Sequence, residues 1–299
     1  MKKPVFFSIV IPFFNREKFL EKAITSVLNQ TSPNWELILV DDYSSDNSMS
    51  VVNSFSDSRI KILSHSTNKG NAIARNTGWK ASTYDWIAYL DSDDWYEPDY
   101  LDKITQAIYD HPNSVFFWTG VRFVNRSGSS IKEEFWKPLK VLPSDTFFDQ
   151  LRIGTNAGVC FSKSVLEELG GFEIKLRASV DREFFLRISQ HYEGLGVEFT
   201  GVNCLIGTHE SVRKSYHHQA KAYDFINEKY KILIKKNSIR KRWWYHKAMW
   251  LSLYSGDKGK AFQYLKKMNY PIKSLLLFFF FSVLPTSNAI LLHKKFAIK

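Results

Sequence analysis

The chain has 299 residues, of which 44% are hydrophobic and 16% aromatic, so its composition excludes wholesale disorder. The formal net charge of +11 is unevenly placed, because residues 213–299 hold 19 Lys and Arg against 3 Asp and Glu. A basic tail on a mildly acidic body predicts an anionic partner for the tail: a membrane surface, a nucleic acid or an acidic polymer.

Strands and helices alternate over the first 110 residues. The opening segment 6–14 resembles the apolar part of a signal peptide, but it contains Pro12 and lacks a small-residue cleavage site. It is therefore expected to be a strand. Near-continuous apolar strands separated by helices predict an α/β fold, with a mostly parallel sheet flanked by helices. The expected strands are 6–14, 35–42, 59–65 and 85–94, and the expected helices are 16–30, 44–55, 68–82 and 97–110.

The pattern loosens after residue 113. Cys160 and Cys204 are too few for a disulfide framework, and they suit core positions in a protein from a reducing compartment. The sequence predicts strands over 114–128 and 197–210, short helices over 145–154 and 162–172, and a clear helix over 181–192.

The chain is expected to be helical from about residue 217, with 257–270 packing on the preceding helix as a hairpin. The most apolar run, 274–285, ends at Pro285, well short of the roughly 20 apolar residues that a membrane-spanning helix needs. Flanking lysines and the tryptophans of KRWWYHKAMW favour a helix in the membrane interface. The alternatives are a helix packed on its neighbours and a membrane-spanning helix that extends to residue 292.

Acidic residues follow two of the predicted strands. Asp91, Asp93 and Asp94 come directly after the apolar run that ends at Leu90. Two carboxylates one residue apart can share a hard divalent ion, and Mg²⁺ and Mn²⁺ leave coordination positions for substrate phosphates. The alternative is a solvated acidic turn, or a cap for the helix that follows.

Three further groups could join such a site, since ligands bind beyond the carboxyl ends of parallel strands. Asp41 and Asp42 end the second strand, where a carboxylate can accept a hydrogen bond from a base or ribose, or cap a helix. Arg75 could steady a diphosphate. Asp181 begins an amphipathic helix, where it could cap the helix or act as a general base.

Six segments in this order resemble the family 2 glycosyltransferases, which have the glycosyltransferase-A fold. The resemblance covers roughly residues 6–215. The segments are SIVIPFFNREKFLEKAITSVLNQT, WELILVDDYSSDNS, NKGNAIARNTG, IAYLDSDDW, SKSVLEELGGF and DREFFLR.

The resemblance implies a nucleotide-diphosphate-sugar donor, Mn²⁺ or Mg²⁺, and an inverting single displacement. It implies that Asp181 is the catalytic base, that Asp93 and Asp91 ligate the metal, and that Asp91 with Ser92 contacts the donor. The remaining donor-binding residues that it implies are Pro12, Phe14, Asp41, Asp42, Arg75, His209 and Arg213. Among these, it implies that Asp42 accepts a hydrogen bond from the base, with Asp41 beside it.

Three departures from the family pattern bear on these roles. Val180 precedes Asp181 where the family commonly has Glu, and Phe14 stands where Tyr is frequent, so stacking survives without a hydroxyl. The Q-x-x-R-W motif of processive synthases is incomplete, because Ile239 occupies the Gln position in SIRKRWW. Transfer of a single sugar fits this sequence better than processive synthesis.

The resulting hypothesis has two parts. Residues 1–215 are expected to form the catalytic domain, with a nucleotide-sugar half (1–112) and an acceptor half (113–215), and residues 216–299 a helical, basic, membrane-associating tail. The enzyme would work peripherally at the cytoplasmic face of the cell membrane, on a glycan or lipid-linked acceptor in surface-polysaccharide synthesis, with no nucleic acid expected. A sugar-phosphate nucleotidyltransferase and a nucleic-acid-binding protein are the alternatives, but no glycine-rich phosphate loop follows the first strand.

Overall fold

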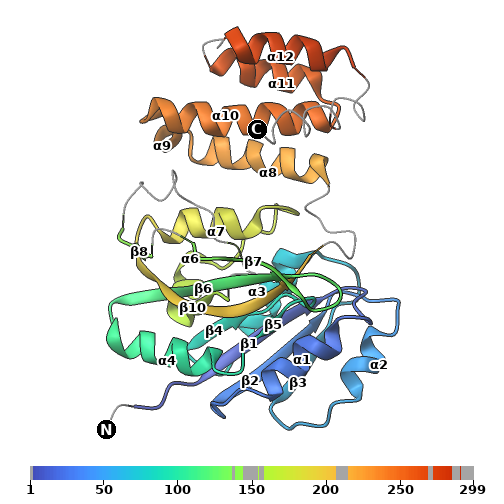
Figure 1. The fold of residues 1–299 in the computed structure, drawn as a ribbon, viewed down its shortest axis with the longest axis vertical. Coiled ribbons are helices and arrows are strands. Elements are labelled where there is room, and N and C mark those ends of the chain that lie inside the picture. Colours follow the sequence, from blue (N-terminus) through green and yellow to red (C-terminus); the bar gives the residue numbers. More distant parts are fainter. Residues whose placement is uncertain are drawn as a thin grey trace. The chain divides into compact units, whose positions relative to one another are not determined.

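The computed structural model describes residues 3–136, 139–143, 154, 158–206, 215–268, 272–284 and 290. The chain forms two compact units. The first, Met1–Ile174 with Asp181–His209, contains the sheet, and the second, Lys175–Val180 with Glu210–Lys299, contains the C-terminal helices (Figure 1).

Four parallel strands form the first half of the sheet, in the order β3-β2-β1-β4. β1 and β2 are runs buried along their whole length, of the kind that parallel sheets bury on both faces, whereas the edge strand β3 is partly exposed. The register aligns Phe13 with Asp41 and Val10 with Tyr89, so the carboxyl ends of β1, β2 and β4 lie at one edge. These strands are β1 (Phe7–Phe13), β2 (Trp35–Asp41), β3 (Ile60–Ser64) and β4 (Trp86–Tyr89).

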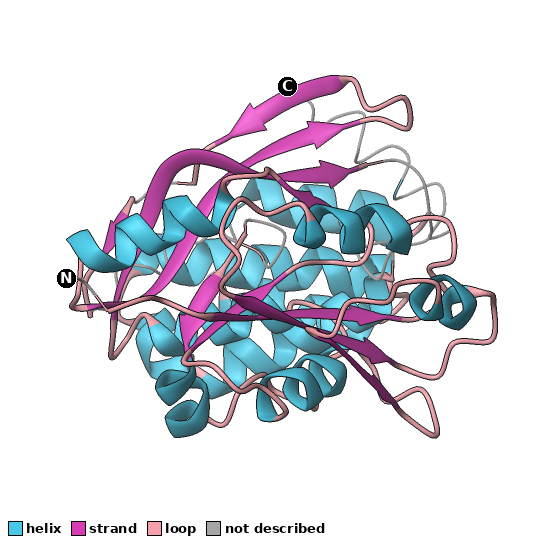
Figure 2. Ribbon diagram, turned by 90° about the horizontal axis from the view of Figure 1, so that it is seen from below, coloured by secondary structure: helices cyan, strands magenta, loops and turns pink. Residues whose placement is uncertain are grey.

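Helices cover both faces of this sheet (Figure 2). Ile9 and Ile11 of β1 belong to a core shared with α1 (Leu20–Leu28) and α4 (Tyr100–Asp110). Val10 points the other way, toward α3 (Asn71–Lys80), where a Cβ added to Gly78 would lie 2.3 Å from its side chain. Glycine at position 78 thus lets α3 approach the sheet closely.

The second half of the sheet is mixed. β6 (Ser114–Val124) and β10 (Glu193–Leu205) run parallel, while β9 (Cys160–Ser162) joins β4 to β6 in antiparallel fashion and β5 (Trp95–Tyr96) pairs antiparallel with β10. The sequence analysis did not predict the short β5 and β9. Cys160 and Cys204 are free and buried, as expected.

Shorter elements complete the first unit. The α/β fold with a mostly parallel sheet is confirmed, whereas most of the helix expected over 145–154 lies outside the described residues. These elements are α2 (Ser48–Asn53), β7 (Ser130–Glu134), β8 (Lys140–Val141), α6 (Lys163–Leu169) and α7 (Val180–Ile188).

The C-terminal unit is helical, as predicted. The side chains of Asn237 and Asp257 accept hydrogen bonds from backbone N–H groups and cap α10 and α11. None of its described helices, nor any described helix elsewhere in the chain, is long and apolar enough to cross a membrane. The helices are α8 (Tyr216–Lys229), α9 (Lys231–Lys235), α10 (Ser238–Tyr254), α11 (Lys258–Lys267) and α12 (Ile272–Ser282).

Candidate active site

Backbone hydrogen bonds tie the loops at the carboxyl edge of the sheet together. Leu90 N–H donates to the carbonyl of Val10, and Asp42 N–H donates to the carbonyl of Phe13, each continuing the ladder past a strand end. The acidic segments that follow β2 and β4 therefore begin on either side of the β1 loop.

Asp42 holds the loop that leads into α3. Its Oδ1 accepts from Lys69 N–H (2.8 Å) and its Oδ2 from Gly70 N–H (2.6 Å). Oδ1 also lies 2.7 Å from Nδ1 of His65, whose Nε2 lies 2.9 Å from Thr77 Oγ1 on α3. The buried carboxylate thus joins the ends of β2 and β3 to the start of α3.

Removing the imidazole of His65 should weaken the connection between the ends of β2 and β3 and helix α3. We expect His65→Ala to destabilise the protein by about 1–3 kcal/mol, because the buried Asp42 carboxylate and the Thr77 hydroxyl lose a hydrogen-bond partner. Urea unfolding measures the change, with His191→Ala, at an exposed histidine, as the matched control. Equal stabilities of the two variants would contradict the assigned role of His65.

The loops after β1 and β2 are fastened to each other. Asn15 N–H donates to Ser44 Oγ (3.0 Å), and Asn15 Oδ1 accepts from Ser45 N–H (2.8 Å). Asn15 and Tyr43 have positive φ angles of 52° and 72°, a strained conformation that clusters at functional sites. The side chains flanking these bonds, Phe14 and Tyr43, are 41% and 56% exposed and so available to a ligand.

Asp41 lies beneath these loops. Its side chain is buried, and its Oδ1 accepts a hydrogen bond of 2.9 Å from Ser44 N–H. Pro12 is buried in β1, two residues before the exposed Phe14. The structure thus gathers Pro12, Phe14 and both aspartates at the ends of neighbouring strands.

Arg75 and Asp91 form an ion pair between α3 and the end of β4. The Nη2–Oδ1 distance is 2.6 Å, and the side chains are 4% and 24% exposed. The guanidinium is therefore buried, while Asp91 keeps an open side toward solvent. The ion pair thus holds the positively charged guanidinium of Arg75 against Asp91, which is one of the two predicted metal ligands.

The segment 91–94 is a tight turn, in which Asp94 N–H donates to the Asp91 carbonyl (3.0 Å). Asp94 is buried, and its Oδ1 accepts from Leu205 N–H of β10. Burial raises the pKa of Asp94 well above its usual value, and the nearby carboxylates of Asp93 and Asp91 raise it further. Ser92 is buried between them, whereas Asp93 is partly exposed.

The residues present fit a divalent cation that takes part of its coordination from a substrate. Asp91 and Asp93 supply hard oxygen ligands of the kind that Mg²⁺ and Mn²⁺ prefer. Among the described residues, no three His, Cys, Asp or Glu side chains are placed to hold a metal ion by themselves.

A second set of hydrogen bonds links α3 to the segment before α7. Asn76, next to Arg75, donates from Nδ2 to the carbonyl of Phe172 (2.8 Å) and accepts at Oδ1 from its N–H (2.8 Å). Gly171 has a φ of +70°, and an added Cβ would lie 2.4 Å from Asn76 Oδ1. Glycine at this position lets the turn and α3 meet.

Helix α7, which carries Asp181, is anchored to the same turn. Its Glu183 is fully buried and pairs with Arg187 (2.9 Å), which also donates to the carbonyls of Leu169 and Gly171. Asp181 lies in the first turn of α7, partly exposed, and its Oδ1 accepts from Arg182 N–H (2.8 Å). Phe172 and its neighbours thus connect the helix of Asp181 with the helix of Arg75.

Breaking this anchor should be costly. We expect Arg187→Ala to destabilise the protein by about 3 kcal/mol, because it leaves the buried Glu183 carboxylate without its arginine. Urea unfolding measures the loss. The control is Lys132→Ala, which removes an exposed ion pair with Glu134 and should cost about 1 kcal/mol or less. Comparable losses in both variants would contradict the anchoring role of Arg187.

The sequence analysis missed four residues that shape this site, namely His65, Tyr43, Asn76 and Arg187. Tyr43 offered a signal, as an aromatic residue directly after an acidic strand end. The partners of the other three are fixed by the tertiary structure. Two predicted donor-binding residues, His209 and Arg213, lie outside the described residues.

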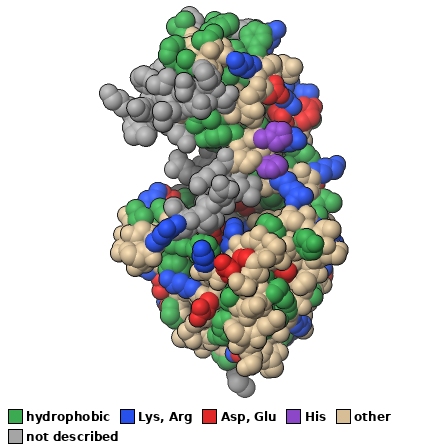
Figure 3. Space-filling view, turned by 90° about the vertical axis from the view of Figure 1, so that its right-hand side faces the viewer, with side chains coloured by type: hydrophobic (Ala, Val, Ile, Leu, Met, Phe, Trp, Pro, Cys, Tyr) green, Lys and Arg blue, Asp and Glu red, His purple; other side chains and the backbone are tan. Residues whose placement is uncertain are grey.

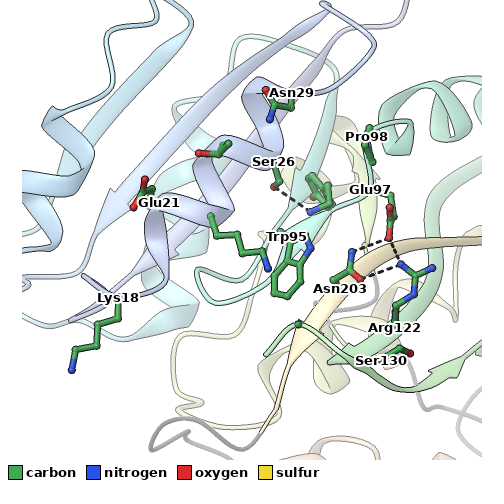
Figure 4. A pocket seen from close by; sticks show the side chains of 14 residues that line it. Lys18, Glu21, Ser26, Asn29, Trp95, Glu97, Pro98, Arg122, Ser130 and Asn203 are labelled. Carbon is green, nitrogen blue, oxygen red and sulfur yellow. Dashed lines mark hydrogen bonds and ion pairs between the residues drawn. The ribbon is translucent and has the colours of Figure 1, made fainter. Parts of the chain in front are cut away.

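A polar groove of about 770 Å³ lies between α1, β5 and the β6–β7 hairpin (Figure 4). Glu97 lines the groove and accepts from Arg122 and from Asn203 (2.9 Å). Trp95, one residue after the aspartate turn, contributes its indole, with Lys22 Nζ 3.1 Å from the ring centroid. Of the predicted donor-binding and metal-binding residues that the structure describes, none lines this groove.

Comparison with known proteins identifies the family. The model of glycosyl transferase family 2 matches residues 8–170, more than half of the chain, and the chain belongs to this family. The predicted resemblance is thereby confirmed, and the protein is a glycosyltransferase. This membership favours the transferase hypothesis over the nucleotidyltransferase alternative.

Individual relatives agree with this assignment. The chain is 28% identical to an uncharacterized Haemophilus influenzae glycosyltransferase, over 75% of this chain and 76% of that protein. It is 40% identical to the Escherichia coli UDP-Glc:alpha-D-GlcNAc-diphosphoundecaprenol beta-1,3-glucosyltransferase WfgD, over 45% of this chain and 52% of that protein. The structure of Staphylococcus aureus TarS 1–349 with UDP-GlcNAc has the same fold (TM-score 0.62, 15% identity, 89% of both chains covered).

Proposed function

We propose that the protein transfers one sugar from a nucleotide-diphosphate sugar to a hydroxyl of a glycan acceptor, with inversion at the anomeric carbon. The observation that carries this proposal is the convergence of Asp41, the Arg75–Asp91 pair and the aspartate turn on one edge of the sheet. The fold neighbour that binds UDP-GlcNAc supports a donor of this class.

Recognition of the base falls to the loops after β1 and β2. Both carboxylate oxygens of Asp42 accept bonds from the chain itself, so we assign the contact with the base to Asp41 and the support of the loop to Asp42. Phe14 and Tyr43 are exposed on either side of the Asn15–Ser44 bond, where their rings can stack on the base.

Asp91 and Asp93 would hold Mn²⁺ or Mg²⁺. When bound, the metal would neutralise charge on the diphosphate leaving group. Arg75 is buried beside Asp91 and supplies a fixed positive charge on the same side of the donor. Ser92, and His209 and Arg213 beyond the described residues, complete the proposed donor site.

Asp181 accepts the proton of the acceptor hydroxyl as that oxygen attacks the anomeric carbon. A new C–O bond forms while the bond from that carbon to the diphosphate oxygen breaks, so the nucleotide diphosphate leaves with the electron pair. The position of Asp181 in the first turn of α7 leaves its carboxylate partly exposed, as a general base requires.

The acceptor we propose is lipid-linked. The name of WfgD specifies an acceptor on diphosphoundecaprenol, and TuaG of Bacillus subtilis, 30% identical over 133 residues, is named as a putative teichuronic acid biosynthesis glycosyltransferase. The basic C-terminal segment suits an anionic membrane. We therefore place the enzyme peripherally at the cytoplasmic face of the cell membrane, in surface-polysaccharide synthesis.

A donor panel tests the proposal. The purified protein is incubated with UDP-, GDP- and dTDP-sugars, with Mn²⁺ or with EDTA, and with a lipid extract as the source of acceptor. We expect metal-dependent release of one nucleotide diphosphate and a lipid product heavier by one sugar in the mass spectrum. Release of pyrophosphate, or of no nucleotide with any donor, would contradict the proposal.

A further inference from the structure

The outer face of α12 is an exposed apolar stripe. Leu276, Phe279, Phe280 and Val283 are 66%, 54%, 53% and 78% exposed. The spacing of Leu276, Phe279 and Phe280 places them along one side of α12, and Val283 continues the row one residue past the end of the helix at Ser282. Four large apolar side chains in one continuous row differ from the scattered exposed apolar residues of an ordinary surface.

The inner contact of α12 fixes which way this stripe faces. Phe278 is only 4% exposed, and its ring packs on Phe262 of α11 with the centroids 5.8 Å apart. Because α12 already uses another side against α11, the stripe cannot turn inward without breaking that contact. The stripe is therefore a second apolar face, separate from the one that packs in the C-terminal unit.

Positive charge accompanies the stripe. From Lys258 to Lys299 the sequence contains eight lysines and no acidic residue. Lys266 and Lys267 are exposed on α11, the helix against which α12 packs. The space-filling view shows basic side chains beside apolar ones on the C-terminal helices (Figure 3).

This combination points to one class of partner. A segment with a net charge of +8 repels a second copy of itself, which argues against a dimer through this face. The 11 residues of α12 are too short to span a bilayer, whereas an interfacial helix needs only an apolar face and neighbouring cations.

We infer that Leu276, Phe279, Phe280 and Val283 insert into the surface of an anionic lipid bilayer, with the lysines around them on the headgroups. The inference rests on the proposed function, since it supplies the surface by which the enzyme reaches a lipid-linked acceptor. The side chains enter the boundary between headgroups and acyl chains, and α12 lies parallel to the membrane plane.

Vesicle binding by the full chain tests the inference. Co-sedimentation with phosphatidylglycerol-containing vesicles is compared for the wild type and for Leu276→Ser/Phe279→Ser/Phe280→Ser. We expect the triple variant to bind about tenfold more weakly or worse, since it loses most of the inserted area. Ile131→Ser/Ile174→Ser, two exposed apolar residues of the first unit, is the matched control and should bind like the wild type.

A probe on the stripe tests insertion without removing the stripe. The native cysteines are buried, so Val283→Cys can carry an environment-sensitive dye. We expect a blue shift of the emission with anionic vesicles, a weaker one with phosphatidylcholine vesicles, and none from the same dye on Ile131→Cys. We expect the triple variant to hydrolyse the donor in solution at the wild-type rate and with the same metal dependence. This result would show that its catalytic unit is intact.

Two results would overturn the inference. One is equal vesicle binding by the wild type and the triple variant, with no shift from the dye at position 283. The other is a concentration-dependent dimer that the triple variant abolishes while vesicle binding stays unchanged, which would assign the stripe to a second copy of the chain. If the wild type hydrolyses no donor, the proposed function is contradicted. The vesicle-binding results then test the membrane inference independently.

Discussion

Asp181→Asn should reduce sugar transfer by on the order of 10³-fold while leaving donor binding nearly unchanged, because proton acceptance by a placed carboxylate contributes about 10²–10⁴-fold. The asparagine preserves the size and polarity of the side chain at the first turn of α7. Only the capacity to accept the acceptor proton is lost. Initial rates at saturating donor and acceptor, with nucleotide-diphosphate affinity by calorimetry, separate the chemical step from binding.

The matched control for this prediction is Asp110→Asn. Asp110 lies at the end of α4 in the same unit, and its exposed carboxylate accepts a hydrogen bond from Gln106 (2.7 Å). It should retain wild-type rates. If Asp181→Asn turned over normally, another group would have to be the base. If it lost donor affinity as well as rate, Asp181 would belong to the donor site.

Asp93→Asn should lower transfer on the order of 10²-fold and raise the Mn²⁺ concentration needed for half-maximal activity, because it removes an anionic oxygen from the proposed metal site. A metal titration at saturating donor measures both effects. EDTA should bring the wild type down to the rate of the variant without metal, and added Mn²⁺ should restore the wild type at a lower concentration than it needs to activate the variant.

The control for Asp93 is Asp85→Asn. Asp85 is exposed beside the other end of β4, away from the carboxyl edge of the sheet, so its carboxylate cannot reach the proposed site. Wild-type metal dependence of Asp93→Asn would show that the metal is held elsewhere. A loss of similar size in Asp85→Asn would show that the effect is one of net charge and not of ligation.

The parallel half of the sheet could be predicted because β1, β2 and β4 are almost wholly buried and read as apolar runs, with helices between them and beside the partly exposed edge strand β3. β9 and β5, with three and two residues, are too short to show a period. Each is fixed by its partners, β4 and β6 for β9, and β10 for β5. Their pairing depends on contacts between distant parts of the chain.

The candidate site was predictable as far as its residue types. Acidic residues at strand ends indicated a metal and nucleotide site, and the family resemblance placed Asp42 on the base with Asp41 beside it. In the structure Asp42 accepts from Lys69 and Gly70, 27 and 28 residues away, which is why we propose Asp41 for that contact instead. The anchoring of α7 was equally hidden, since it depends on Arg187, which pairs with the buried Glu183 and reaches carbonyl groups of the preceding turn.

The stereochemistry of the reaction tests the central claim most directly. With an α-linked nucleotide sugar as donor, proton NMR of the first product records the configuration of its anomeric carbon. A single displacement assisted by Asp181 predicts the β-configuration from the earliest time points. A product with the α-configuration would require two displacements or a different geometry, and would contradict the roles given to Asp181 and to the donor site.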